Sequence, residues 1–279
     1  MILNRRLVEL CNDPVMRKPK SKSRRGPKDS PDKQLSIPRG RLLVGIHAVN
    51  EAIKVRPHAI NELYLKKGYS ENADLSEFAD WAKAHRIPIK ETSIGFFNKI
   101  CPSHQGICLV VQERPQVSYE ELKSDGAKQV MVLDGIEDPH NLGAIVRTAW
   151  LMGVSAIFTP SQRSTSLTPT AIKVACGGAE HVPVSEESNL ASTLSDLKDM
   201  GYWIYALDHR ADKVVWQEDF PEKVAWVVGA EGKGVRKPIL SASDVWLKIP
   251  QIDAEASYNA SVAAALALGE CRRQQLNLS

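Results

Sequence analysis

The stretch VMVLDGIEDPHNLGAIVRTA, residues 130–149, indicates the fold of the longer part of this 279-residue chain. Its four opening apolar residues are typical of a buried strand, and apolar residues recur at helical spacing after Pro139. A strand that leads into a helix is the repeating unit of α/β proteins, whose ligands bind beyond the carboxyl ends of the parallel strands. The connecting loop lacks the glycine-rich phosphate-binding pattern, and it offers Asn141 and Arg147 instead.

The same alternation of strands and helices continues to the end of the chain. It predicts an α/β fold with a mostly parallel sheet that is covered by helices on both faces. Strands are expected at 130–133, 156–158, 181–184, 203–206, 225–228 and 245–249, and helices at 141–152, 168–175, 189–200, 235–241 and 258–273.

A second, smaller α/β pattern precedes this one. Strands are expected there at 63–65, 87–89 and 107–111, and helices at 47–54, 75–85 and 94–100. Pro115, a charged run and Gly126 are typical of a linker. The chain is therefore expected to comprise a basic tail (1–41), a small domain (42–114), a linker (115–129) and a larger domain (130–279).

The net charge of +3 is unevenly distributed along the chain. Residues 1–41 hold twelve Lys or Arg and four acidic residues, a net charge of +8, so the remainder carries −5. Residues 12–41 have almost no large apolar groups and are expected to be disordered. This tail suits an arm for a polyanion such as RNA, or a solvated segment that aids solubility.

The composition argues against several other classes of protein. No apolar run is long enough to span a bilayer, and the opening MILNRRLVEL is not typical of a secretory signal. The five cysteines show no CxxC spacing, which argues against a zinc site and a disulfide framework and favours a cytoplasmic location. The histidines show no metal-ligand spacing, so no metal is expected.

Asn141 and Arg147 form the first of three segments that suggest chemistry. Leu142, Ile145 and Val146 share one helix face, so Arg147 points away from the sheet. Side chains lean toward the helix N-terminus, so a long Arg can reach back to Asn141 and the exposed N–H groups there. The pair suits an anion or hydroxyl site; alternatively, Asn141 caps the helix and Arg147 is a surface cation.

The second segment is VVGAEGKGV, residues 227–235, in which an apolar strand ends at Gly229. Its glycines match neither dinucleotide nor P-loop spacing, and Glu231 would repel a phosphate. The segment suits close backbone approach to a neutral or cationic ligand, or it is a plain tight turn.

The third segment is SYNASVAAALALGE, residues 257–270. Residues 262–268 are apolar on every side, which predicts a helix that is buried all round. Ser257, Asn259 and Ser261 cluster at its start, where one of them can cap the helix and the others can take a second role.

Together the three segments resemble the three motifs of the SpoU (TrmH) family of RNA 2′-O-methyltransferases. The matching stretches are DPHNLGAIVRTA, VVGAEGKGV and IPQIDAEASYNASVAAA, in the family's order. PTAIKVACGGAEHVPV (169–184) is similar to the segment between the first two motifs. VGIHAVNEAI (44–53) and HQGI (104–107) resemble the RNA substrate-binding domain of the RlmB-like subgroup, whose fold is similar to that of certain ribosomal proteins.

The resemblance implies a SPOUT-type parallel sheet with a C-terminal trefoil knot, a homodimer, and methyl transfer from S-adenosylmethionine to a guanosine ribose of 23S rRNA. It also implies that Arg147 contacts the RNA phosphate and hydroxyl, that Asn141 and Glu231 orient this site, and that Ser257 and Asn259 complete it. The implied cofactor-binding residues are Gly229, Ala230, Gly232, Ile249, Pro250, Tyr258 and Asn259.

The third motif departs from the family pattern at three positions. Gln251 and Asp253 stand where the family has Met and Gly, and Tyr258 stands where it has Leu. An Asp in place of a Gly would strain a turn that needs a positive φ. Two alternatives therefore stay open: a tRNA ribose methyltransferase, and a catalytically silent RNA-binding factor of ribosome assembly.

Overall fold

The computed structural model describes residues 37–112, 114–126, 128–253 and 256–277. Most of the expected basic tail lies outside these ranges, although its last residue, Arg41, belongs to the first strand. Within the described ranges, no helix combines the length and hydrophobicity that crossing a membrane requires.

The first sheet has four strands in the order β1-β4-β2-β3, with β4 antiparallel to both of its neighbours. It is buried on both faces, since Leu109 packs on the side of α1 and α2 while Cys108 packs on the side of α3. The elements are β1 (Arg41–Val44), α1 (Ile46–Val55), β2 (Ile60–Lys66), α2 (Ala73–Ala84), β3 (Ile89–Thr92), α3 (Ile94–Asn98) and β4 (Ile107–Val111).

The second sheet has seven strands in the order β7-β6-β5-β10-β8-β11-β9, and every pair in it is parallel. The prediction of a mostly parallel α/β sheet is thus confirmed. The strands are β5 (Lys128–Asp134), β6 (Val154–Pro160), β7 (Val184–Glu187), β8 (Trp203–Leu207), β9 (Lys213–Val214), β10 (Lys223–Gly229) and β11 (Val245–Lys248).

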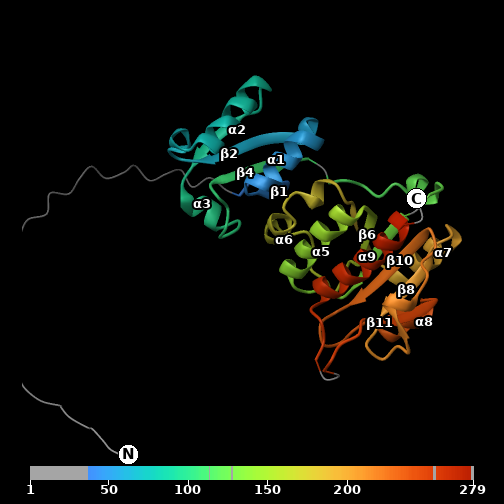
Figure 1. Cartoon of the computed structure of the whole chain (residues 1–279). Coiled ribbons are helices and arrows are strands. Elements are labelled where there is room, and N and C mark those ends of the chain that lie inside the picture. The colour runs from blue at the N-terminus through green and yellow to red at the C-terminus, as the bar shows by residue number, and fades with distance from the viewer. Residues whose placement is uncertain (1–36, 113, 127, 254–255, 278–279) are drawn as a thin grey trace, which may run out of the picture. The chain divides into compact units, whose positions relative to one another are not determined.

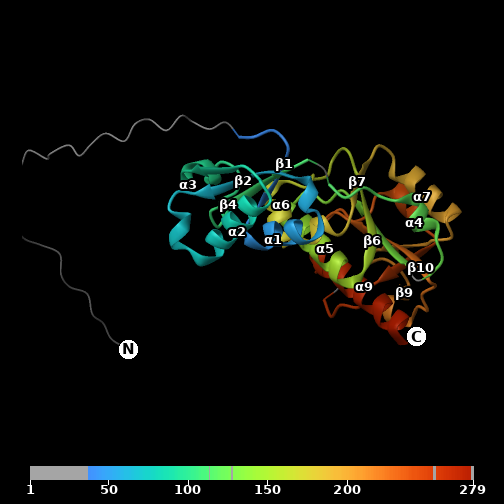
Figure 2. The same cartoon turned by 90° about the horizontal axis from the view of Figure 1, so that it is seen from above.

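Helices cover both faces of this parallel sheet (Figures 1 and 2). Successive residues of β5 point to opposite faces: Met131 and Leu133 join the core under α5 and α9, whereas Val130 and Val132 join the core under α4, α7 and α8. The helices are α4 (Tyr119–Lys123), α5 (Pro139–Met152), α6 (Pro169–Val174), α7 (Leu190–Asp199), α8 (Lys237–Ala242) and α9 (Ala260–Asn277).

The centre of the sheet is a topological switch point. β5 and β10 lie side by side, with Asp134 in register with Gly229. From β5 the chain continues to β6 and β7 on one side, and from β10 it continues to β11 on the other. The loops after β5 and β10 therefore diverge at the carboxyl edge, where ligands of open α/β sheets bind.

Four details differ from the sequence-based expectations. Strand β1 (Arg41–Val44) was not predicted, and it includes Arg41, which was expected to be disordered. β7 begins at Val184 instead of residue 181, because Gly177 has φ +100° and starts a 3₁₀ turn, Gly178–Glu180. The two-residue strand β9 was not predicted, since two residues show no periodicity. The expected linker contains α4, whose Leu122 is buried in the core under α7 and α8.

Candidate active site

The first motif forms the start of α5, directly after β5. Asp138 caps this helix, since its side chain accepts a hydrogen bond from the backbone N–H of His140 (2.9 Å), and Pro139 occupies the first helical position. The alternative that Asn141 is the helix cap is therefore wrong. Asn141 lies in the first turn, and its side chain is free to bond elsewhere although the residue is only 8% exposed.

The second motif is a tight turn after β10. The backbone N–H of Gly234 donates to the carbonyl of Ala230 (2.8 Å), so the chain folds back on itself. A Cβ atom on Gly229 would lie 2.1 Å from the carbonyl carbon of Gly234, which no side chain tolerates. The turn holds Glu231 at the carboxyl edge of the sheet, where the side chain is exposed.

Asn259, in the third motif, joins the three loops. Its Oδ1 accepts from the backbone N–H of Ser261 (2.9 Å), which caps α9. Its Nδ2 donates to Asn141 Oδ1 (2.9 Å) and to Glu231 Oε1 (2.5 Å). This arrangement fixes the amide orientation, because only the NH₂ group can donate to a carboxylate. Capping and a second role, the two alternatives from the sequence, are therefore combined in one side chain.

Arg147 lies on the exposed side of α5, as the helical spacing predicts. Its Nη1 donates to Cys176 Sγ (3.5 Å), and no hydrogen bond between Arg147 and Asn141 is found among the described residues. The structure thus unites Asn141, Glu231 and Asn259 into one network and holds Arg147 apart from it, beside the segment at 169–184.

A cavity of about 550 Å³ opens next to this network. Gly229, Ala230, Gly232 and Ile249 line it together with Ser257 and Tyr258, and the Tyr258 hydroxyl donates to the carbonyl of Pro250 (3.1 Å). Five of the seven residues expected to bind the cofactor therefore line one cavity. The other two are next to its wall in the chain, since Pro250 follows Ile249 and Asn259 precedes Ala260.

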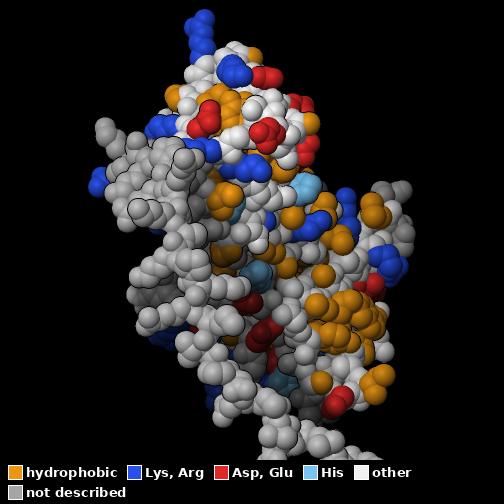
Figure 3. All heavy atoms as spheres, turned by 90° about the vertical axis from the view of Figure 1, so that its left-hand side faces the viewer, with side chains coloured by type: hydrophobic (Ala, Val, Ile, Leu, Met, Phe, Trp, Pro, Cys, Tyr) orange, Lys and Arg blue, Asp and Glu red, His pale blue; other side chains and the backbone are white. Residues whose placement is uncertain are grey.

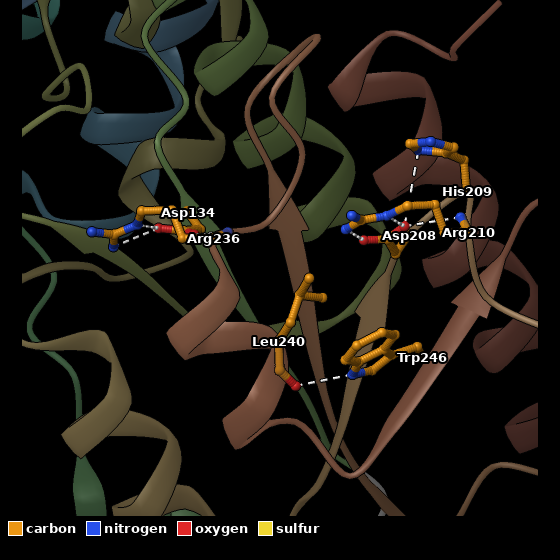
Figure 4. A network of polar contacts seen from close by, with 7 residues as sticks. All are labelled: Asp134, Asp208, His209, Arg210, Arg236, Leu240 and Trp246. Carbon is orange, nitrogen blue, oxygen red and sulfur yellow. Dashed lines mark hydrogen bonds and ion pairs between the residues drawn. The ribbon is translucent and has the colours of Figure 1, made fainter. Parts of the chain in front are cut away.

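One wall of the cavity was not foreseen from the sequence. Asp208, directly after β8, accepts from Arg210 Nε (2.9 Å) and Nη2 (2.6 Å), and both residues line the cavity (Figure 4). The hydrogen bonds from Arg210 lower the pKa of Asp208, so this carboxylate stays ionised. The usable signal was the position of the polar run DHR at the carboxyl end of a predicted strand.

The unusual residues of the third motif, Gln251 and Asp253, fit the loop without backbone strain at Asp253. Gln251 Nε2 donates to the carbonyl of Ala256 (2.6 Å), which closes the loop across its base. Asp253 does not have a positive φ, unlike four other described non-glycine residues (Arg86, Gln105, Arg163 and Cys176). The strain expected from an Asp at this position is therefore not observed.

The cavity suits S-adenosylmethionine on chemical grounds. Its volume lies in the usual range for sites of small molecules. Its glycine turn lets a ligand approach the backbone closely, and the carboxylate of Glu231 complements a sulfonium cation, whereas Asp208 is already paired with Arg210. No group of three or more His, Cys, Asp or Glu side chains that could hold a metal ion occurs in the described ranges.

Comparison with known proteins agrees with this geometry. The SpoU rRNA methylase family model matches residues 128–269, and the model of the RNA 2′-O ribose methyltransferase substrate-binding domain matches residues 42–117. The 23S rRNA (guanosine-2′-O-)-methyltransferase RlmB of Neisseria meningitidis is 36% identical over 241 residues, which cover 85% of this chain and 96% of that protein. A Staphylococcus haemolyticus protein assigned to the TrmH family of tRNA/rRNA methyltransferases is 34% identical over 242 residues, which cover 84% of this chain and 96% of that protein.

Among solved structures, the SpoU methyltransferase AviRb of Streptomyces viridochromogenes in complex with S-adenosylmethionine has a TM-score of 0.74 at 17% identity. The match covers 84% of this chain and 90% of AviRb, and at this identity it shows a shared fold.

The family models and the curated relatives identify this chain as an S-adenosylmethionine-dependent RNA 2′-O-methyltransferase, and the glycine-lined cavity beside the three-loop polar network is compatible with that class. The family matches make the assignment specific. The chain belongs to the SpoU rRNA methylase family.

Proposed function

We propose that this enzyme transfers a methyl group from S-adenosylmethionine to the ribose 2′-hydroxyl of a guanosine in 23S rRNA. The observation that carries the proposal is the bridge from Asn259 to Asn141 and Glu231 at the mouth of the cavity. The similarity to the RlmB protein of Neisseria meningitidis, which extends through both matched regions, supports the choice of rRNA.

In this proposal the cofactor lies against the backbone of Gly229, Ala230 and Gly232 and against the 249–258 loop. When bound, S-adenosylmethionine supplies a methyl group that the adjacent sulfonium activates for attack. Glu231 contributes a negative charge that favours a cation in this cavity. The side chain of Asn259 keeps Glu231 and Asn141 in fixed positions, so the site needs little reorganisation when RNA arrives.

Arg147 acts on the RNA in this proposal. Its guanidinium leaves Cys176, contacts the 2′-hydroxyl and the neighbouring phosphate, and stabilises the alkoxide as the proton departs. A guanidinium stays protonated at neutral pH and is therefore not the base; the proton of the 2′-hydroxyl passes by way of the neighbouring phosphate to water. Asn141 and Ser257 position the ribose between Arg147 and the cavity.

The remaining expectations complete the proposal. The small domain (42–114), with a fold similar to that of certain ribosomal proteins, recruits the RNA; the basic tail (1–41) strengthens this binding; and residues 115–129 link the small domain to the methyltransferase domain (130–279). The methyltransferase domain contains a C-terminal trefoil knot. An rRNA substrate is compatible with the cytoplasmic location expected from the cysteine usage.

A homodimer is also part of the proposal, and α9 supports it. Ala264, Ala267, Leu268 and Cys271 are fully buried against the sheet and α5, whereas Val262 is 45% exposed. The prediction that this helix is buried on every side is therefore wrong for the single chain, because no described element covers its outer side. A second copy of α9 would bury the outer side of the helix, which carries Val262 and, one turn on, the half-buried Leu266; this pair is called the apolar stripe of α9.

The proposal is tested with purified protein, tritiated S-adenosylmethionine, 23S rRNA from cells that lack the gene, and total tRNA. We expect label in 23S rRNA and none in tRNA. Label in tRNA alone would establish the tRNA alternative. RNA binding without transfer to either RNA would establish the silent assembly factor.

A further inference from the structure

A second hollow, of about 290 Å³, lies at the same edge of the parallel sheet as the cofactor cavity. The loop after β6 (160–163), the start of α7 and the start of α8 line it, so it lies on the β6 and β7 side of the switch point. The cofactor cavity lies on the β8 and β11 side. The lining includes Arg163 and Arg236 and contains no carboxylate.

Arg236 is held in place by a buried carboxylate. Its backbone N–H donates to Asp134 Oδ2 (2.8 Å), and its Nε donates to Asp134 Oδ1 (2.7 Å). Its Nη2 lies 2.6 Å from the same oxygen, and the Asp134 side chain is fully buried (Figure 4). The ion pair therefore fixes a guanidinium whose side chain is still 47% exposed, and no described residue accepts a hydrogen bond from its Nη1.

Arg163 is positioned by its backbone conformation and not by an ion pair. It has φ +60°, a left-handed conformation that is costly for a residue with a side chain. The loop that carries it is tied to the first-motif loop, because Ser164 Oγ (3.0 Å) and the backbone N–H of Thr165 (2.8 Å) both donate to the carbonyl of Ile136. Arg163 is exposed and forms no ion pair with any described residue. The strained backbone thus holds an uncompensated cation beside the active-site loop.

The carboxylates nearest in sequence to this hollow are engaged elsewhere. Glu186 pairs with Arg114 (3.2 Å), and Glu187 accepts from Ser185 (2.6 Å). On the face drawn in Figure 3, Lys and Arg side chains are interspersed with acidic and hydrophobic ones. On that face the cationic side chains are therefore discrete and do not form a continuous basic field.

We infer that this hollow binds a backbone phosphodiester of the substrate RNA, with Arg163 and Arg236 as its two cationic contacts. The inference rests on the proposed function, and it adds a site on the side of the switch point opposite the cofactor. A planar guanidinium matches the two oxygens of a phosphodiester, and the absence of lining carboxylates avoids repulsion.

Arg163→Gln tests the inference, because Arg236 is coupled to a buried carboxylate and its replacement would also disturb folding. Lys213→Gln is the matched control, since it removes one cation from β9, at the opposite edge of the sheet from β7. Filter binding of transcribed 23S rRNA is measured over a series of KCl concentrations. The Kd for S-adenosylmethionine and the melting temperature of each variant are measured in parallel.

We expect Arg163→Gln to weaken RNA binding by about 3- to 10-fold and to lower the salt slope by ~1, while leaving the Kd for S-adenosylmethionine unchanged. Arg163→Lys should restore most of the salt slope. The inference would be overturned if Arg163→Gln bound 23S rRNA with the same affinity and the same salt slope as Lys213→Gln. A loss confined to S-adenosylmethionine binding would overturn it as well.

The wild-type protein separates this inference from the proposed function. If it binds 23S rRNA without methylating it, the proposed function is overturned, whereas the comparison of Arg163→Gln with Lys213→Gln still decides whether the hollow is an RNA site.

Discussion

The side chain of Asn259 has two structural roles, which depend on different atoms of its amide. Its oxygen caps the N-terminus of α9 by accepting from the backbone N–H of Ser261, and its nitrogen donates to both Asn141 and Glu231. An aspartate in this position could still cap the helix, but it could not donate to Glu231. The two roles can therefore be separated by substitution.

For Asn259→Asp we expect methyl transfer to fall by roughly 10²-fold, because a second carboxylate would face Glu231 at 2.5 Å and repel it. The melting temperature should change little, since the cap is retained. Steady-state kinetics with tritiated S-adenosylmethionine check this. Ser261→Ala, which removes only a hydroxyl that donates to Asn259, is the control and should lose less than about tenfold. Wild-type activity in Asn259→Asp would contradict the role given to the bridge.

At the scale of elements, α5 is packed unusually closely against its neighbours. A Cβ atom on Gly143 would lie 2.5 Å from the carbonyl oxygen of Ala171 and 2.7 Å from Cβ of Val174. α5 also contacts α9 and the turn at 178–180, so its position sets that of both Asn141 and Arg147.

Gly143→Ala should therefore lower the free energy of unfolding by about 1–3 kcal/mol, although alanine favours helices in general. Urea denaturation measures the change. Gly95→Ala in α3, where the nearest side-chain atom is 3.7 Å from the added Cβ, should stay within about 0.5 kcal/mol of the wild type. A neutral Gly143→Ala would show that α6 yields easily and that the close packing does not fix α5.

His104, before β4, gives the small domain a pH dependence. Burial, and then the charges of Lys173 and Lys66, lower the pKa of His104, whose Nδ1 accepts from the backbone N–H of Gly106 (2.8 Å). The folded state thus holds the neutral ring, and the unfolded state takes up a proton more readily. This contribution to stability is present above the unfolded pKa of about 6.5 and is lost as the pH falls through the lower folded pKa.

We therefore expect the free energy of unfolding to fall between pH 7.5 and pH 5, and to fall less steeply in His104→Asn, whose amide oxygen can still accept from Gly106. Urea titrations at a series of pH values give both slopes. Identical slopes for the two proteins would show that His104 makes no contribution of this kind.

Sequence patterns predicted the elements well where periodicity is strong. The run at 107–111 matches β4, and 47–54 lies within α1. They failed at 181–184, because nothing in the sequence signals the left-handed Gly177. The same holds for the site. The three motifs identified Asn141, Glu231 and Asn259, but the hydrogen bonds by which Asn259 bridges the other two loops depend on tertiary folding. The pairing of Asp134 with Arg236, which are 102 positions apart, depends on it as well.

At the scale of the whole molecule, the outer side of α9 tests the proposed homodimer. Val262→Glu would place a charge on this stripe, where the side chain is 45% exposed in the single chain. We expect the variant to sediment as a monomer at a concentration where the wild type is a dimer. Val55→Glu, at a position that is 40% exposed on α1, is the control and should leave the mass unchanged. A monomeric wild type, or a dimeric Val262→Glu, would contradict the proposed interface.

The central claim is that the three-loop network directs methyl transfer to a ribose 2′-oxygen, and alkaline hydrolysis of the labelled product tests it most directly. A 2′-O-methyl group blocks cleavage at the adjacent phosphodiester, whereas a methylated base does not. We therefore predict that tritium transferred to 23S rRNA appears in alkali-resistant dinucleotides, and that Arg147→Ala transfers none. Label recovered in mononucleotides would show methylation of a base and would contradict the account.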